Sequence, residues 1–113
     1  MFHRTLTSQE LDLVRHMLAG VPDGESIGGD LSSRLVREMN DGGMGSLRFV
    51  SDEPAGKAGR EIAKATFNDA DGTLATVSLF LDRLGHLYEL DIWKVDFSPL
   101  QRIPSVDLVS ISG

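Results

Sequence analysis

Apolar and polar residues alternate through much of residues 61–97, and this pattern constrains the fold more than any other feature of the chain. Successive side chains of a strand point to opposite faces, so a period of two predicts half-buried strands. The segments D-A-D-G and D-R-L-G between the apolar runs have the composition of tight turns. The sequence therefore predicts a hairpin of residues 61–68 with 73–82, and a third strand from residue 86 to 92 or beyond. The Glu, Ala and Lys residues of the first strand also suit a helix, but its β-rich neighbours favour a strand.

An amphipathic helix is predicted over residues 8–19. It follows a T-S-Q-E capping box, in which Thr7 accepts a hydrogen bond from the N–H of Glu10 and the Glu10 side chain accepts one from the N–H of Thr7. Apolar residues then recur on one face at helical spacing, namely Leu11, Val14 and Leu18. The Gly-, Asp- and Ser-rich residues 20–32 are expected to form a loop.

A second hairpin is predicted from residues 34–39 and 46–51, joined by a turn that contains three glycines. Leu35 and Met39 share one face of its first strand. The tail after Pro99 is too apolar for disorder, so it is expected to dock on the body or to add an edge strand. The predicted fold is one α+β domain over 1–113, with the N-terminal helix packed on an antiparallel meander sheet of about five strands.

The composition narrows the classes of partner and the compartment. The chain of 113 residues has a formal net charge of −6, which argues against binding to nucleic acid or to an anionic membrane. It has no cysteine, so disulfides and thiolate chemistry are excluded. The start M-F-H-R-T-L-T-S-Q-E lacks the apolar region of a signal peptide, and no apolar run approaches the roughly 18 residues of a membrane span. A cytoplasmic protein is expected.

The segment Y-E-L-D-I-W-K-V-D-F, residues 88–97, changes the phase of its apolar residues halfway along. One interpretation is a β-bulge or bend between Ile92 and Trp93, since one extra residue moves every later side chain to the other face. Trp93, Val95 and Phe97 would then be buried under the helix or in a dimer contact. This interpretation is favoured because buried aromatic residues are mostly structural.

The second interpretation keeps this strand regular. Glu89, Asp91 and Trp93 would then lie on one exposed face, as an aromatic anchor flanked by two carboxylates. Exposed Trp is a frequent hot spot of protein interfaces, and acids beside it would select a basic partner. The two interpretations are compatible, because bulges often lie next to functional surfaces.

No catalytic, metal or cofactor motif stands out. N-D-A-D-G resembles the start of a calcium loop, but the position that needs an acid holds Phe80. G-G-M-G lacks the spacing of phosphate-binding loops, and no G-x-S-x-G motif is present. The histidines are scattered, which does not favour a metal site. The sequence therefore predicts no enzyme, no metal and no cofactor.

The stretch D-G-G-M-G-S-L-R-F, together with L-Y-E-L-D-I-W-K-V-D-F-S-P-L, resembles a family of small bacterial proteins known only as a domain of unknown function. The N-terminal R-T-L-T-S-Q-E-L-D-L-V-R-H-M-L is similar too, so the resemblance spans about residues 4–104. Small acidic α+β proteins of this kind are frequent among toxin-neutralising immunity proteins. The resemblance thus implies such a role, and it implies no catalytic residue.

A non-enzymatic protein-binding module is therefore expected, in its most specific form an immunity-type inhibitor of a basic protein or toxin. The expected partner-binding residues are Met44, at a turn tip, and the segment residues Glu89, Asp91, Trp93, Lys94 and Asp96. The alternative is a structural, self-associating domain, in which I-W-K-V-D-F and the apolar tail form a homodimer contact. A small-molecule or hydrolytic site that uses Glu89 and Asp91 is the third candidate.

Overall fold

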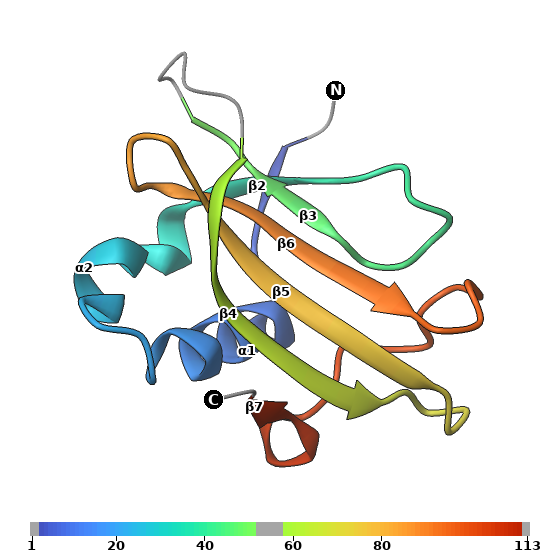
Figure 1. Cartoon of the computed structure of the whole chain (residues 1–113). Helices are drawn as coiled ribbons and strands as arrows, with labels where there is room; N and C mark the ends of the chain where they lie inside the picture. The colour runs from blue at the N-terminus through green and yellow to red at the C-terminus, as the bar shows by residue number, and fades with distance from the viewer. Residues whose placement is uncertain (1–2, 52–57, 112–113) are drawn as a thin grey trace.

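The computed structural model describes residues 3–51 and 58–111. Seven strands in this part of the chain form one antiparallel sheet: β1 (Arg4–Thr5), β2 (Leu35–Glu38), β3 (Leu47–Phe49), β4 (Ala58–Asn68), β5 (Leu74–Asp82), β6 (Leu87–Lys94) and β7 (Ser110–Ile111). The helix α1 (Ser8–Leu18) lies behind β4 and β5 in Figure 1. We call the face that it covers the inner face, and the face toward the viewer the outer face. This two-layer arrangement confirms the predicted α+β class.

The strand order β1-β2-β3-β6-β5-β4-β7 corrects the predicted simple meander. Both predicted hairpins are present, as β2–β3 and β4–β5, and residues 61–67 are strand. The chain after β3, however, crosses to the far side of the sheet, so that β6 returns between β3 and β5. The expected count of about five strands was too low because it did not include β1 and β7, which are strands of only two residues at the two edges of the sheet. The tail therefore supplies an edge strand, which pairs with β4.

The capping box begins α1 as the sequence predicts. Thr7 Oγ1 accepts from the N–H of Glu10 at 3.2 Å, and Glu10 Oε1 accepts from the N–H of Thr7 at 2.9 Å. Arg4 of β1 also forms a two-pronged contact with the Glu10 carboxylate, at 2.7 and 2.9 Å. Burial favours a raised pKa for Glu10, but the hydrogen bonds from Arg4 and Thr7 outweigh it and hold the pKa below its ordinary value. One carboxylate thus caps the helix and joins it to the sheet.

Residues 20–32 are more ordered than the predicted loop. They contain the short helix α2 (Gly24–Gly28), and the 3₁₀ turn η1 (Leu31–Ser33) begins at their end. Gly24 passes so close to the end of α1 that a Cβ there would lie 2.1 Å from the Leu18 carbonyl oxygen. Only glycine permits this approach. No helix in the described ranges is long and apolar enough to cross a membrane.

The core lies between the inner face of the sheet and α1. The buried apolar residues come from every long strand and from the helix, and include Leu13, Val14, Met17, Leu47, Val77, Leu79, Leu90 and Ile92. In β2 the buried residue is Val36, whereas Leu35 lies on the outer face and is exposed. The apolar residues that alternate in phase with Leu35 therefore do not identify the side of this strand that faces the core. Val109 of the tail also joins the core.

Strand β6 contains a bulge, but not between Ile92 and Trp93. Its pairing with β5 shifts between Glu89 and Leu87, which leaves Tyr88 as the extra residue. From Glu89 onward the register is regular, and Ile92 and Trp93 lie opposite successive residues of β5. The favoured interpretation of the phase change is therefore wrong about the position of the bulge, and from Glu89 to Trp93 the structure shows the regular strand of the second interpretation.

The inward position of Val36 can be tested by a matched pair of substitutions. Val36→Ala removes fully buried methyl groups and should lower the free energy of unfolding by about 2 kcal/mol. Leu35→Ala, one residue earlier on the exposed face, should change it by less than about 0.5 kcal/mol. Urea unfolding measures both values, and a larger loss for Leu35→Ala would contradict this register.

Candidate functional site

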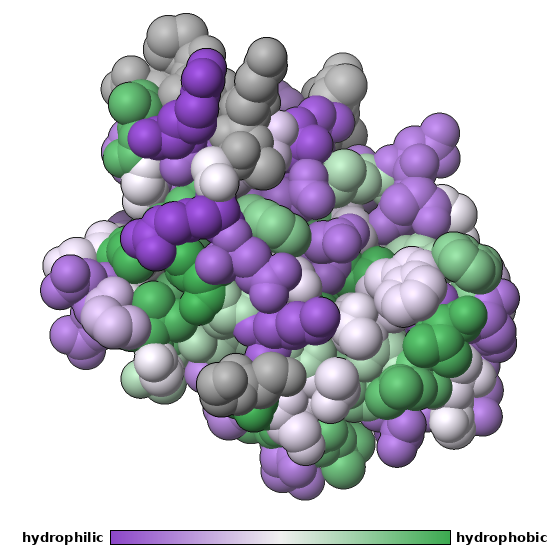
Figure 2. Space-filling view, viewed as in Figure 1, coloured by the Kyte–Doolittle hydropathy of each residue, from purple (hydrophilic) through white to green (hydrophobic). Residues whose placement is uncertain are grey.

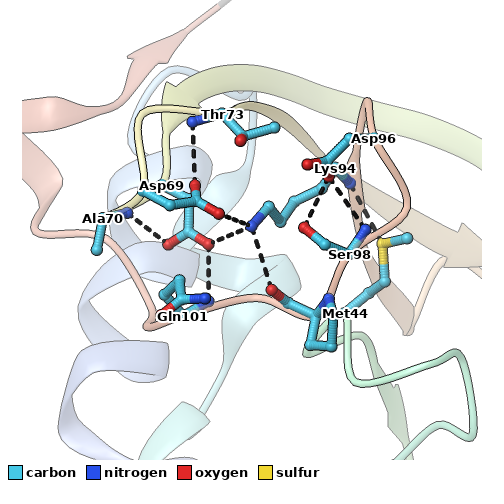
Figure 3. Close-up of polar contacts among 10 residues, drawn as sticks. Met44, Asp69, Ala70, Thr73, Lys94, Asp96, Ser98 and Gln101 are labelled. Carbon is cyan, nitrogen blue, oxygen red and sulfur yellow. Dashed lines mark hydrogen bonds and ion pairs between the residues drawn. The ribbon is translucent and has the colours of Figure 1, made fainter.

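Lys94, the last residue of β6, faces the interior and is 0% exposed. Its Nζ lies 2.9 Å from Asp69 Oδ2 and 2.8 Å from Asp71 Oδ2. Nζ also donates a hydrogen bond of 3.1 Å to the carbonyl of Pro99 (Figure 3). We call Lys94, Asp69 and Asp71 the Lys94 cluster. Two carboxylates from the β4–β5 turn and a carbonyl from the chain after β6 thus match the three donor hydrogens of the ammonium group.

Asp69 is the buried carboxylate of the Lys94 cluster. It accepts from the N–H of Ala70 at 2.8 Å and from the N–H of Gln101 at 2.7 Å (Figure 3). Burial favours a raised pKa, but the N–H of Gln101 and the Lys94 ammonium outweigh it and hold the pKa of Asp69 below its ordinary value. Burial likewise favours a lowered pKa for Lys94, and the two carboxylates hold it above its ordinary value. The cluster therefore stays ionised and joins the turn, β6 and the tail.

The glycine-rich loop before β3 closes over this cluster. The Met44 sulfur accepts the backbone N–H of Lys94 at 3.2 Å, and the Gly43 carbonyl accepts the N–H of Leu100 at 2.9 Å. Met44 is only 6% exposed, so it folds back onto the sheet. Neither Lys94 nor Met44 is thus accessible to a partner, which corrects their expected place among the partner-binding residues.

The chain reverses directly after Lys94. The N–H of Phe97 donates to the Lys94 carbonyl at 3.0 Å, and the Asp96 carboxylate accepts from the backbone and the hydroxyl of Ser98 at 3.0 and 2.7 Å. Phe97 has a φ of +62°, a left-handed conformation that costs a residue other than glycine about 1–2 kcal/mol. The contact of Pro99 with Lys94 then holds the far end of this reversal.

Four apolar side chains remain exposed around this reversal, and we call them the Trp93 patch: Leu74, Trp93, Val95 and Phe97. Trp93 is 41% and Phe97 68% exposed, and their rings pack edge to face with centroids 5.6 Å apart. The N–H of Val95 donates to the Leu74 carbonyl, which places these two residues side by side. Figure 2 shows hydrophobic side chains gathered at the right of the outer face, beside the end of β6. The predicted burial of the aromatic residues under the helix is therefore wrong.

Three carboxylates accompany the Trp93 patch. Glu89 and Asp91 share the outer face of β6 with Trp93, but Arg48 Nη2 lies 2.9 Å from Glu89 and neutralises it. Asp91 accepts a hydrogen bond from Ser46 Oγ at 3.3 Å and has no ion pair within the described ranges. Asp96 is exposed and bonds only within its own turn. Asp91 and Asp96 are thus the carboxylates without a cation beside the patch.

Sequence reasoning missed Leu74, Val95 and Phe97 as surface residues. Val95 and Phe97 share the parity of Trp93. The favoured interpretation assumed that all three residues were buried, so it did not predict Val95 and Phe97 as surface residues. The informative signal was Lys94, which occupies the inner parity of Leu90 and Ile92. A lysine at that position needs acidic partners, and the turn N-D-A-D-G supplies them.

The geometry gives little support to the third candidate, a small-molecule or hydrolytic site that uses Glu89 and Asp91. Arg48 holds Glu89, and neither carboxylate lines any of four surface pockets found over the described ranges. Those ranges also contain no group of three or more His, Asp or Glu side chains placed to hold a metal ion.

A model of the family described as "Domain of unknown function (DUF6984)" matches residues 3–104, so the chain belongs to this family. Searches of curated proteins and of solved structures gave no match.

Substitutions at the two aspartates test the Lys94 cluster. Asp69→Asn removes the fully buried counter-charge of Lys94 and leaves only the partly exposed Asp71 beside the ammonium group, which should clearly lower the free energy of unfolding. Asp71→Asn should cost clearly less, because the Asp71 side chain is 35% exposed and Asp69 remains paired. Equal losses for the two variants in chemical denaturation would contradict this account of the cluster.

The lowered pKa of Asp69 also predicts how stability depends on pH. A carboxylate whose pKa is lower in the folded state stabilises the fold above its unfolded pKa, near 3.8, and this contribution is lost as the pH falls through the folded pKa. The free energy of unfolding should therefore fall more steeply on acidification in the wild type than in Asp69→Asn. Denaturation series from neutral pH to about pH 3 compare the two slopes, and parallel slopes would contradict the prediction.

Proposed function

We propose that this member of the DUF6984 family is a non-enzymatic module that binds a basic protein through the Trp93 patch, as a cytoplasmic inhibitor of the immunity type. The observation that carries this proposal is the exposed pair of Trp93 and Phe97 beside carboxylates that lack a cation.

The energetics of interfaces favour such a surface. Trp is enriched among the few residues that supply most of the binding free energy. Phe97 also keeps a strained backbone while most of its ring faces solvent, and strain of this kind tends to occur at functional sites. Because the Lys94 cluster anchors the reversal, the patch is held rigidly and little conformational entropy is lost on binding.

Charge determines the class of partner. Asp91 and Asp96 flank the patch, and the chain as a whole carries a net charge of −6. An acidic rim around an apolar centre attracts a cationic surface and disfavours an anionic one. A toxin with a basic binding surface fits this pattern.

The second candidate function is self-association, and the charges of the outer face favour it. Three basic side chains lie on or beside β1–β3, and we call them the basic row: His3, Arg37 and Arg48. The Trp93 patch, with Asp91 and Asp96 beside it, lies on the same face around the end of β6. Two copies related by a two-fold axis would therefore place the basic row of each against the patch of the other.

Affinity capture from a lysate of the source organism, followed by titration of the purified partner, tests the first proposal. Trp93→Ala should weaken binding by about thirtyfold or more, which corresponds to about 2 kcal/mol. The double variant Asp91→Asn, Asp96→Asn should slow association, most strongly at low salt. Leu84→Ala, which truncates an exposed residue of the β5–β6 turn, is the control and should bind as the wild type does.

The outcomes separate the two functions. The inhibitor function is supported if Trp93→Ala no longer binds a basic partner that the wild type and Leu84→Ala both bind. Capture of the chain alone, with a dimer in light scattering that Trp93→Ala dissociates, would replace it with self-association. Unchanged partner binding by the folded Trp93→Ala protein would remove the patch from either function.

A further inference from the structure

The inhibitor function proposed above does not use the basic row, whose geometry supports a different kind of site. Arg37 and Arg48 are directly paired residues of β2 and β3, and both point to the outer face. His3 precedes β1, whose pairing of Arg4 with Val36 leads His3 toward Arg37. Two arginines of neighbouring strands and the histidine before β1 thus lie in line across the sheet.

These side chains line a surface pocket of about 200 Å³ at the end of β3 and the start of β6. Its wall also includes Ser51 and Tyr88, and the guanidinium of Arg48 lies 4.4 Å from the centre of the Tyr88 ring. The pocket thus combines cationic groups, a hydroxyl and an aromatic face. Sites for small ligands usually have this mixture of a few polar groups and an apolar wall.

The positive charge of the pocket is only partly compensated. Glu89 pairs with Arg48, whereas Arg37 has no ion pair within the described ranges. Like charges directly opposite each other on neighbouring strands lower stability. Asp82 also lines the pocket, but its side chain is only 3% exposed and already accepts the backbone N–H groups of Leu84 and His86. Within the described residues, Arg37 therefore keeps a positive charge without an ion-pair partner at the mouth of this pocket.

We propose that this pocket binds the phosphate group of a small phosphate monoester. A phosphate group can bridge the guanidinium groups of Arg37 and Arg48 and supply a counter-charge to Arg37, because the planar guanidinium matches phosphate oxygens in bidentate geometry. Glu89 already compensates one of the two arginine charges, so the choice of phosphate rests on its three terminal oxygens, which can accept from both guanidinium groups at once, whereas one guanidinium group already fills the two oxygens of a carboxylate. The aromatic wall at Tyr88 accepts the organic part of the ester.

The test is calorimetric titration at constant ionic strength with three probes: phenyl phosphate, inorganic phosphate and acetate. Phenyl phosphate should bind saturably and more tightly than inorganic phosphate, and acetate should not bind. Arg37→Gln should weaken phosphate binding by about tenfold or more. Arg102→Gln, which alters an exposed arginine of the tail outside this pocket, should leave it unchanged.

The stability of the Arg37→Gln variant distinguishes a structural role of Arg37 from a role in binding phosphate. Without phosphate, Arg37→Gln should be as stable as the wild type or more stable, because it removes a like-charge neighbour. Equal binding by Arg37→Gln and the wild type, equal losses in both arginine variants, or saturable binding of acetate would overturn the proposal. A preference for inorganic phosphate over its ester would overturn the role given to Tyr88.

Discussion

Lys94 holds its ammonium group inside the protein, in contact with Asp69, Asp71 and the carbonyl of Pro99. Removing a charge from water costs several kcal/mol, so such a group stays buried only while well-placed partners neutralise it. The partners come from the β4–β5 turn and from the chain after β6, and the Met44 sulfur binds the backbone of the same residue. One side chain thus determines where the turn, the glycine-rich loop and the start of the tail meet. These contacts also bring together residues 41–49 and 87–100, two of the three segments that carry the resemblance to the family.

The exposed surface follows from this buried contact. Because Lys94 points inward, the alternation of β6 places Trp93 on the outer face. Because Pro99 must return to the ammonium group within five residues of Lys94, the chain reverses at once and leaves Phe97 outside in a left-handed conformation. The apolar patch is therefore a consequence of an ion pair in the interior, and its rigidity comes from the same contacts. A binding surface of this kind is preorganised, so more of its contact energy is available to hold a partner.

The sequence predicted the elements that depend on local patterns. The capping box at Thr7, both hairpins and the strand at 61–68 are present because turn chemistry and period-two alternation act over a few residues. It did not predict the insertion of β6 between β3 and β5, because strand order depends on contacts between distant segments. The site was predicted wrongly for a related reason. A lysine at an inner position of β6 interrupts the apolar alternation, so in the sequence it looks like a change of phase. The pairing of Lys94 with Asp69 spans 25 residues of sequence, and alternation alone does not reveal it.

The most direct test of this account uses the single tryptophan of the chain, Trp93. The inward lysine requires the Trp93 ring to be in contact with solvent, whereas a slip between Ile92 and Trp93 would bury it. Quenching of the tryptophan fluorescence by acrylamide, in the native protein and in the unfolded chain, distinguishes these arrangements. We predict substantial quenching of the native monomer, at a sizeable fraction of the unfolded value. A native monomer whose fluorescence is almost unaffected by acrylamide would contradict the inward lysine and the exposed patch together.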